Sequence, residues 1–291
     1  MSTSSEPVAT AGDAWAECYA RRGVWWGNPK EMTRERLEAW GREDWLEDIV
    51  RAAQVCGDHA VRVLEAGCGT GQYSLALALR GYEVDALDYN PAALERARDL
   101  IATVHAGRCA PSLIHGDLLR LPTATDAYDL VFNQQVMEYF VDPEQRQLAL
   151  AQMFRTTKPG GVVVVVVARP GHLLAPIWRR LGWPGFLDQP AMVDLAPREL
   201  EAELRQVGLV DVSSDGIAAW RAVFFWPRWY ERWSATRRAI GTLTRFLELV
   251  RLPRVMRRLL GLQLLVVGRK PTMSTSETVQ SHQEGEPWSE V

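Results

Sequence analysis

Two carboxylates flank a cluster of glycines in a pattern that could hold a nucleoside. Glu65 stands just before the run Gly67-Cys68-Gly69-Thr70-Gly71, and Asp88 follows the strand-like run Val84 to Leu87. Glycines allow a tight turn and let a ligand approach the backbone without meeting a Cβ atom. In a doubly wound sheet, a carboxylate at the end of the second strand accepts hydrogen bonds from ribose hydroxyls. We therefore expect a nucleoside site between these stretches.

The surrounding sequence predicts a strand, a turn and a helix. Val61, Val63 and Leu64 predict a short buried strand that ends at the glycines, and helical spacing continues from Tyr73 to Leu79. A helix that begins directly after the turn would present unpaired N–H groups to the ligand. These elements place the glycines and Asp88 at the same edge of a sheet.

The glycine spacing favours one class of nucleoside cofactor. The dinucleotide fingerprint is G-x-G-x-x-G, whereas this chain has G-x-G-x-G after an acidic residue. The run resembles motif I of the class I S-adenosylmethionine-dependent methyltransferases. The resemblance implies S-adenosyl-L-methionine as the cofactor, and Glu65 would favour its cationic sulfonium and amino group over a pyrophosphate.

Residues 63 to 168 resemble this family at further steps in the same order. These steps are Asp88, the stretch Gly116-Asp117-Leu118 after strand three, the fourth strand Tyr128 to Asn133, and the turn Lys158-Pro159-Gly160-Gly161 before six valines. The resemblance implies that Asp117 lies at the adenine edge and that the fourth strand passes the methionine end. The positions that it assigns to cofactor binding are Glu65, Gly67, Cys68, Gly69, Gly71, Asp88, Tyr89, Asn90, Asp117, Leu118, Asn133 and Gln134.

Methyl transfer from a sulfonium asks little of side chains, because the methyl group is already activated and alignment of the acceptor supplies much of the rate. A base is needed only if the acceptor must lose a proton. Related small-molecule methyltransferases often carry Glu-His where this chain has Glu138-Tyr139, so a histidine base is not carried over. The candidates are Tyr139 and His172. In the alternative interpretation, Tyr139 packs in the core and His172 lies on a solvated loop.

The whole pattern predicts an α/β fold: a doubly wound, Rossmann-like, mostly parallel sheet of seven strands with an antiparallel last strand. We expect a disordered N-terminus at 1–11, a helical cap at 12–58, a cofactor-binding core at 59–168 and a disordered tail at 271–291. Residues 169–270 complete the catalytic domain, with inserts at 169–196 and 217–262. Further elements are predicted at Gln135 to Phe140 (helical), Pro197 to Gly208 (helix), Leu209 to Ser213 (sixth strand) and Gln263 to Arg269 (seventh strand, antiparallel to the sixth).

Aromatic residues in the cap and the second insert are candidates for substrate contacts: Tyr19, Trp25, Trp26, Trp226 and Trp229. In the alternative, these rings are buried as core. The second insert also belongs to an arginine-rich stretch, with ten Arg from Arg221 to Arg258 against Glu231 and Glu248. Its aromatics could line a pocket with an arginine for an anionic group, or sit with the arginines at a lipid interface. Both interpretations predict an apolar acceptor.

Composition limits the classes of function. The 291 residues, 47% of them hydrophobic, can bury one large core, and the net charge of −3 does not suggest a nucleic-acid partner. The four cysteines show no metal-ligand spacing, so no metal is expected. The longest apolar run, Gly160 to Ala168, is too short to cross a bilayer, and the N-terminus lacks a signal pattern, so we expect a cytoplasmic protein with peripheral membrane contact left open.

The favoured function is a methyltransferase that acts on a small, apolar molecule in a bacterial biosynthetic pathway, such as a natural product. One alternative is an RNA or protein methyltransferase, for which the arginine-rich insert is the support. The other is a protein that binds S-adenosylmethionine without catalysing a reaction.

Overall fold

The computed structural model describes residues 33–40, 61–104, 110–169, 171–180, 191–217 and 252–272, together with Trp15, Glu17, Leu46, Ile49 and Ala219. The predicted N-terminal disorder, most of the predicted tail, and the candidate substrate residues Tyr19, Trp25, Trp26, Trp226 and Trp229 lie outside these ranges.

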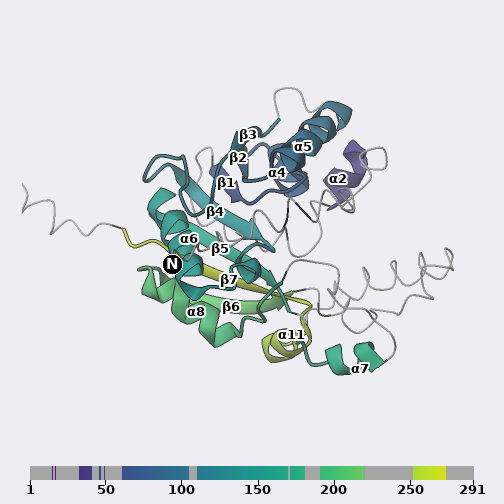
Figure 1. The fold of residues 1–291 in the computed structure, drawn as a ribbon, viewed down its shortest axis with the longest axis vertical. Coiled ribbons are helices and arrows are strands. Elements are labelled where there is room, and N and C mark those ends of the chain that lie inside the picture. Colours follow the sequence, from purple (N-terminus) through teal and green to yellow (C-terminus); the bar gives the residue numbers. More distant parts are fainter. Residues whose placement is uncertain are drawn as a thin grey trace, which may run out of the picture.

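A seven-stranded sheet forms the centre of the molecule (Figure 1), with the strand order β3-β2-β1-β4-β5-β7-β6. The first five strands run parallel, and β7 is antiparallel to both of its neighbours. The predicted fold class is therefore confirmed. The strands are β1 (Arg62–Ala66), β2 (Glu83–Asp88), β3 (Ser112–His115), β4 (Tyr128–Gln134), β5 (Thr157–Ala168), β6 (Val210–Ile217) and β7 (Gln263–Arg269).

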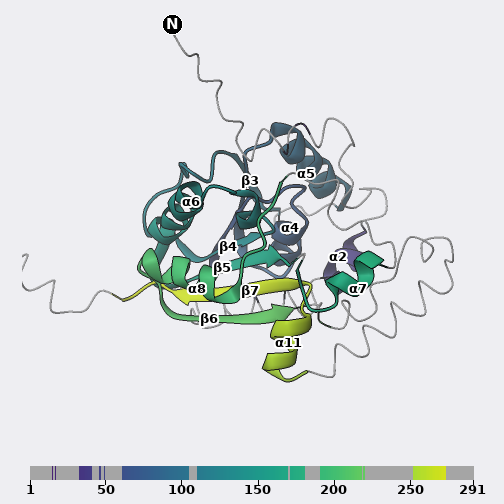
Figure 2. The same cartoon turned by 60° about the horizontal axis from the view of Figure 1, so that its bottom comes forward.

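Helices cover both faces of the sheet (Figure 2). In β5, Val163, Val165 and Val167 pack into the cluster that contains residues of α6 and α8, while Val162, Val164 and Val166 pack into the cluster on the α4 side. A strand buried on both faces needs apolar residues at every position, which explains the six consecutive valines. The helices are α2 (Arg34–Trp40), α4 (Gln72–Ala78), α5 (Pro91–Val104), α6 (Pro143–Thr156), α7 (Ala175–Arg180), α8 (Pro197–Gln206) and α11 (Arg254–Leu260).

Three local expectations need correction. The helical pattern from Gln135 to Phe140 is only a single 3₁₀ turn, η3 (Met137–Tyr139). Lys158 to Gly161 is an irregular part of β5 instead of a separate turn, because Gly160 N–H and Gly161 C=O hydrogen-bond the backbone of Lys270. The sixth strand continues beyond Ser213 to Ile217, where it pairs with β7.

None of the described helices is long and apolar enough to cross a bilayer.

A buried ion pair joins α6 to α8 and also holds the turn after η3. Arg146 Nε donates to both carboxylate oxygens of Glu203 at 2.9 and 2.8 Å, and its Nη1 donates to the carbonyl oxygen of Phe140 at 2.9 Å. The side chains of Arg146 and Glu203 are 3% and 11% exposed. Loss of one partner would leave the other charge buried without compensation.

We expect Arg146→Met to lower the free energy of unfolding by about 3 to 5 kcal/mol, because Glu203 would keep its buried charge without a partner. Arg34→Gln is the matched control: it removes the pair with Glu38, whose members are 51% and 42% exposed, and should cost less than about 1 kcal/mol. Urea denaturation of both variants measures the difference. Equal losses of unfolding free energy in the two variants would show that the buried pair stabilises the protein no more than the exposed pair does.

Candidate functional site

A cavity lies at the carboxyl ends of β1, β2, β3 and β4, the edge at which doubly wound sheets bind their ligands. Its lining comes from the glycine-rich loop, from the ends of the strands and from the η3 turn. The lining residues are Trp15, Glu65, Gly67, Cys68, Gly69, Thr70, Gln72, Tyr73, Leu87, Asp88, Tyr89, Asn90, Gly116, Asp117, Leu118, Leu119, Gln134, Gln135, Val136, Tyr139 and Phe140.

The glycine-rich loop follows β1 and requires its glycines. Gly67, Gly69 and Gly71 have φ angles of 88°, 54° and 72°, a region that residues with a side chain rarely adopt. A Cβ atom on Gly67 would also lie 2.6 Å from a methyl group of Val136. The N–H groups of Gly67 and Cys68 both donate to the carbonyl oxygen of Leu87 at 2.8 Å, so the loop is fixed to β2.

Asp88 connects the glycine-rich loop to the backbone that follows β2. Its Oδ2 accepts a hydrogen bond from Gly69 N–H at 2.7 Å, and its Oδ1 accepts one from Asn90 N–H at 2.8 Å. Burial raises the pKa of Asp88, and these hydrogen bonds oppose the rise. A carboxylate offers about four lone pairs, so each oxygen can accept a further hydrogen bond from a ligand hydroxyl.

Glu65 lies beneath the loop and is 1% exposed. Its Oε2 accepts hydrogen bonds from the backbone N–H and the hydroxyl of Ser74 near the start of α4. Burial raises the pKa of Glu65 to about 8, the Ser74 hydrogen bonds lower it, and the charge of Asp88 raises it further. Glu65 is therefore largely protonated at pH 7 unless a cation enters the cavity.

Several buried polar atoms of lining residues have no hydrogen-bond partner within the described part of the chain: Glu65 Oε1, Asn90 Nδ2, Gln134 Nε2 and Gln134 Oε1. Buried polar groups in proteins are almost always paired, so such a group calls for an explanation. A ligand with donors and acceptors along its length would satisfy them. The carboxylates of Glu65 and Asp88 accept hydrogen bonds, and the amides of Asn90 and Gln134 can donate them. These groups fit a nucleoside that carries an amino-acid chain.

The structure brings most of the predicted cofactor positions together at this cavity, although their contact with a cofactor stays a prediction. Gly71 and Asn133 are the exceptions. Gly71 is the N-cap of α4, and the amide of Asn133 donates to Met153 Sδ at 3.4 Å inside the core. Neighbouring side chains of a strand point to opposite faces, so the orientation of Gln134 toward the cavity turns Asn133 away from it.

The two candidate catalytic residues have different surroundings. Tyr139 lines the cavity and packs edge-to-face against Trp15, with ring centroids 4.9 Å apart and planes at 80°. His172 does not line the cavity, and it is only 1% exposed, so the expected solvated loop is wrong for this residue. Trp15 also lines the cavity, and no local pattern in the sequence signals this contact because Trp15 lies far along the chain from the other lining residues. Gln135, Val136 and Phe140 were signalled only by their closeness to strand four.

A family model described as a methyltransferase domain matches residues 63–161. This part of the chain is a methyltransferase domain, and its motifs resemble those of the class I S-adenosylmethionine-dependent enzymes. The resemblance implies S-adenosylmethionine as the methyl donor, and the unpaired polar atoms and carboxylates of the cavity fit this molecule. Glu65, Asp88, Asn90 and Gln134 are the residues that would hold it.

Relatives named as methyltransferases match part of the chain. The malonyl-[acyl-carrier protein] O-methyltransferase of Serratia marcescens is 34% identical over 122 residues, which cover 41% of this chain and 44% of that protein. The protein of the same name from Halorhodospira halophila is 34% identical over 164 residues, 54% of this chain and 51% of its own. This chain thus matches about half the length of these relatives.

Solved structures share the fold over more of the chain. A methyltransferase from Archaeoglobus fulgidus matches with a TM-score of 0.53 at 16% identity, covering 81% of this chain and 94% of its own. The [4+2]-cyclase SpnF also matches with a TM-score of 0.53, at 19% identity, covering 92% of this chain and 100% of its own. Because a cyclase shares the architecture, the fold alone does not define the reaction.

We expect Asp88→Ala to weaken S-adenosylhomocysteine binding by about 1.5 to 3 kcal/mol, the range for hydrogen bonds to a charged group. Asp85→Ala is the control on the same strand: Asp85 does not line the cavity, and its carboxylate binds Arg62 and the hydroxyl of Tyr128. Calorimetric titration measures both affinities. An unchanged affinity in Asp88→Ala would remove Asp88 from the site.

The raised pKa of Glu65 predicts that cofactor binding is coupled to proton release. Glu65 has a pKa of about 8, so it is mostly protonated at pH 7, and a cationic ligand would favour its ionised form. Titrations of S-adenosylmethionine at pH 7 in buffers of different ionisation enthalpy should show release of a proton, and affinity should rise as the pH rises toward 8. Glu65→Gln should release none through this group. Heats that do not depend on the buffer would show that Glu65 stays neutral in the complex.

Proposed function

We propose that the protein transfers the methyl group of S-adenosylmethionine to a small, largely apolar acceptor in a bacterial biosynthetic pathway. The observation that carries this proposal is the wall of the cavity beyond the cofactor positions. Trp15 packs on Tyr139 there, and Val136 and Phe140 line the same region. Such a wall can bury an apolar acceptor and exclude water from the reacting centre.

The residues of the site can support transfer without a catalytic base. When bound, S-adenosylmethionine supplies a methyl group that its positive sulfur has already activated. Glu65 and Asp88 favour a cationic ligand by charge, and the aromatic faces of Trp15 and Tyr139 attract a cation through their π electrons. The remaining task is to hold the acceptor in line, and alignment of this kind can supply about 7 to 11 kcal/mol of the barrier reduction.

A carboxyl group on an acyl chain is a more specific candidate acceptor, because the relatives from Serratia marcescens and Halorhodospira halophila are named for malonyl groups on acyl-carrier protein. A carboxylic acid is already ionised at neutral pH, so this acceptor would need no base. That requirement suits a chain with Tyr139 in place of a histidine. The buried amide of Gln134 could donate to the carboxylate.

The experiment is incubation of the purified protein with methyl-labelled S-adenosylmethionine and either malonyl-acyl-carrier protein or a bacterial extract. We expect label in the organic extract, or as a base-labile methyl ester on the carrier, and much less of it with Asp88→Ala. Label in RNA or in ordinary protein would support the macromolecular alternative. No transfer to any fraction, despite normal cofactor binding, would support a regulatory protein.

Tyr139→Phe separates a wall from a base in the same assay. If Tyr139 only forms the wall, the variant keeps most of its turnover, because the ring and its contact with Trp15 remain. If Tyr139 removes a proton, turnover should fall by about 10²- to 10⁴-fold while cofactor affinity is kept.

A further inference from the structure

Glu138 lies on η3 between residues that line the cavity, but its own side chain points elsewhere. It is completely buried, and it is not a lining residue. Its Oε1 accepts a hydrogen bond from Ala168 N–H at 2.9 Å, and its backbone carbonyl oxygen accepts one from Val193 N–H at 2.8 Å. Tyr139, the next residue, forms the cavity wall. One residue therefore binds two distant parts of the chain to this wall.

Ala168 and Val193 bracket a segment that lies beyond the matched methyltransferase domain, which ends at residue 161. Ala168 is the last residue of β5, and Val193 precedes α8. The two ends of the segment also meet each other, because a Cβ atom added to Gly171 would overlap the carboxylate of Asp194. Glu138 thus contacts this segment where it leaves the sheet and where it returns.

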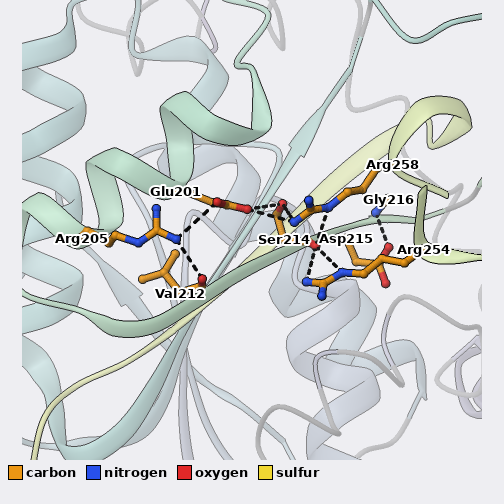
Figure 3. A network of polar contacts seen from close by, with 8 residues as sticks. All are labelled: Glu201, Arg205, Val212, Ser214, Asp215, Gly216, Arg254 and Arg258. Carbon is orange, nitrogen blue, oxygen red and sulfur yellow. Dashed lines mark hydrogen bonds and ion pairs between the residues drawn. The ribbon is translucent and has the colours of Figure 1, made fainter. Parts of the chain in front are cut away.

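The same region is connected to α11, at the end of the second predicted insert. The Arg169 guanidinium donates to the carbonyl oxygen of Arg258, and Leu173 N–H donates to that of Leu259 at 3.1 Å. Figure 3 shows how α11 is attached to the sheet. Arg254 and Arg258 donate to the carbonyl oxygen of Ser214 on β6, and Arg258 also pairs with Glu201 of α8 at 3.1 Å (Figure 3).

We propose that Glu138 is a positioning residue that joins the segment between β5 and α8, and through it α11, to the wall of the cofactor cavity. This inference rests on the proposed function insofar as that wall faces the acceptor. The reason is the pair of bonds from one residue: its side chain fixes the end of β5, and its carbonyl oxygen fixes the return of the chain. Displacement of either partner would shift η3 and Tyr139.

The ionisation of Glu138 supports this role. Burial raises its pKa to about 8, and the Ala168 hydrogen bond acts against the rise. Among the described residues, the charged or titratable groups near the two ends of the adjoining segment include Arg169, His172 and Asp194, and η3 itself carries Tyr139. Burial lowers the pKa of Arg169, and the charge of Asp194 acts in the opposite direction. Glu138 Oε2 has no hydrogen-bond partner among the described residues. The two hydrogen bonds of Glu138, to Ala168 N–H and Val193 N–H, are called the joint below. Above pH 8 the Glu138 carboxylate would hold an uncompensated charge, whereas at pH 7 its neutral carboxyl group can still accept a hydrogen bond from Ala168 N–H.

Hydrogen exchange at two backbone amides tests the joint. In Glu138→Ala, Ala168 N–H loses its acceptor directly, whereas the carbonyl partner of Val193 N–H remains in every variant. A joint therefore predicts faster exchange at both amides, by about tenfold, which corresponds to the loss of one hydrogen bond. Glu138→Gln keeps an acceptor oxygen and should restore slow exchange at both. Faster exchange at Ala168 alone would overturn the proposal.

Asp129→Ala is the matched control, because it removes a buried carboxylate at the amino end of β4, where Asp129 binds Arg62 N–H and Lys158. Asp129→Ala should not change the exchange rates of Ala168 N–H and Val193 N–H relative to the other amides. An effect equal to that of Glu138→Ala would mean general destabilisation and would contradict the proposal.

The pH dependence gives a second test. Between pH 7 and 9, the protection of Val193 N–H from exchange should fall in the wild type but not in Glu138→Gln, and the same fall in both proteins would contradict the proposal. None of these measurements needs methyl transfer, so they stand or fall separately from the proposed activity.

Discussion

The burial of a parallel sheet on both faces is the constraint on which the rest of the structure depends. The valines of β5 contact helices on each side, so successive strands must be connected by helices that cross one face or the other. Every strand from β1 to β4 therefore ends at the same edge. In the order β3-β2-β1-β4, β2 and β3 are added on one side of β1, and the chain then returns to place β4 on the other side. The connections after β1 and β4 diverge at that point, which leaves the crevice where the cavity lies.

The buried ion pair between α6 and α8 differs from the polar groups of this cavity in how fully its atoms are paired. Arg146 and Glu203 bury charge between α6 and α8, and each makes several hydrogen bonds to the other or to backbone. At the cavity, by contrast, Glu65, Asn90 and Gln134 keep buried atoms without partners in the described chain. An unpaired buried group costs about 1 to 3 kcal/mol. At this edge of the sheet a bound ligand could satisfy these atoms and recover that cost.

The sequence was sufficient for features that depend on neighbouring residues. The glycine run and Asp88 could be placed because φ angles, strand ends and helix starts follow from local pattern. Local pattern could not decide between Asn133 and Gln134 as the residue that faces the cavity, because a shift of one residue at the end of a strand reverses which side chain faces the site. Trp15 and the burial of His172 depend on packing between segments far apart in the chain, and no periodicity encodes such contacts.

The carboxylates of the cavity also bear on the direction of the reaction cycle. Burial keeps Glu65 protonated near neutral pH, and only a cation nearby makes its ionised form favourable. Methyl transfer would remove the positive charge from sulfur, so Glu65 would attract the product less strongly than the donor and would tend to regain its proton. Asp88, by comparison, is held by Gly69 and Asn90. The ribose hydroxyls that it is predicted to bind would be unchanged in the reaction. One carboxylate would therefore distinguish donor from product, and the other would hold the nucleoside in both states.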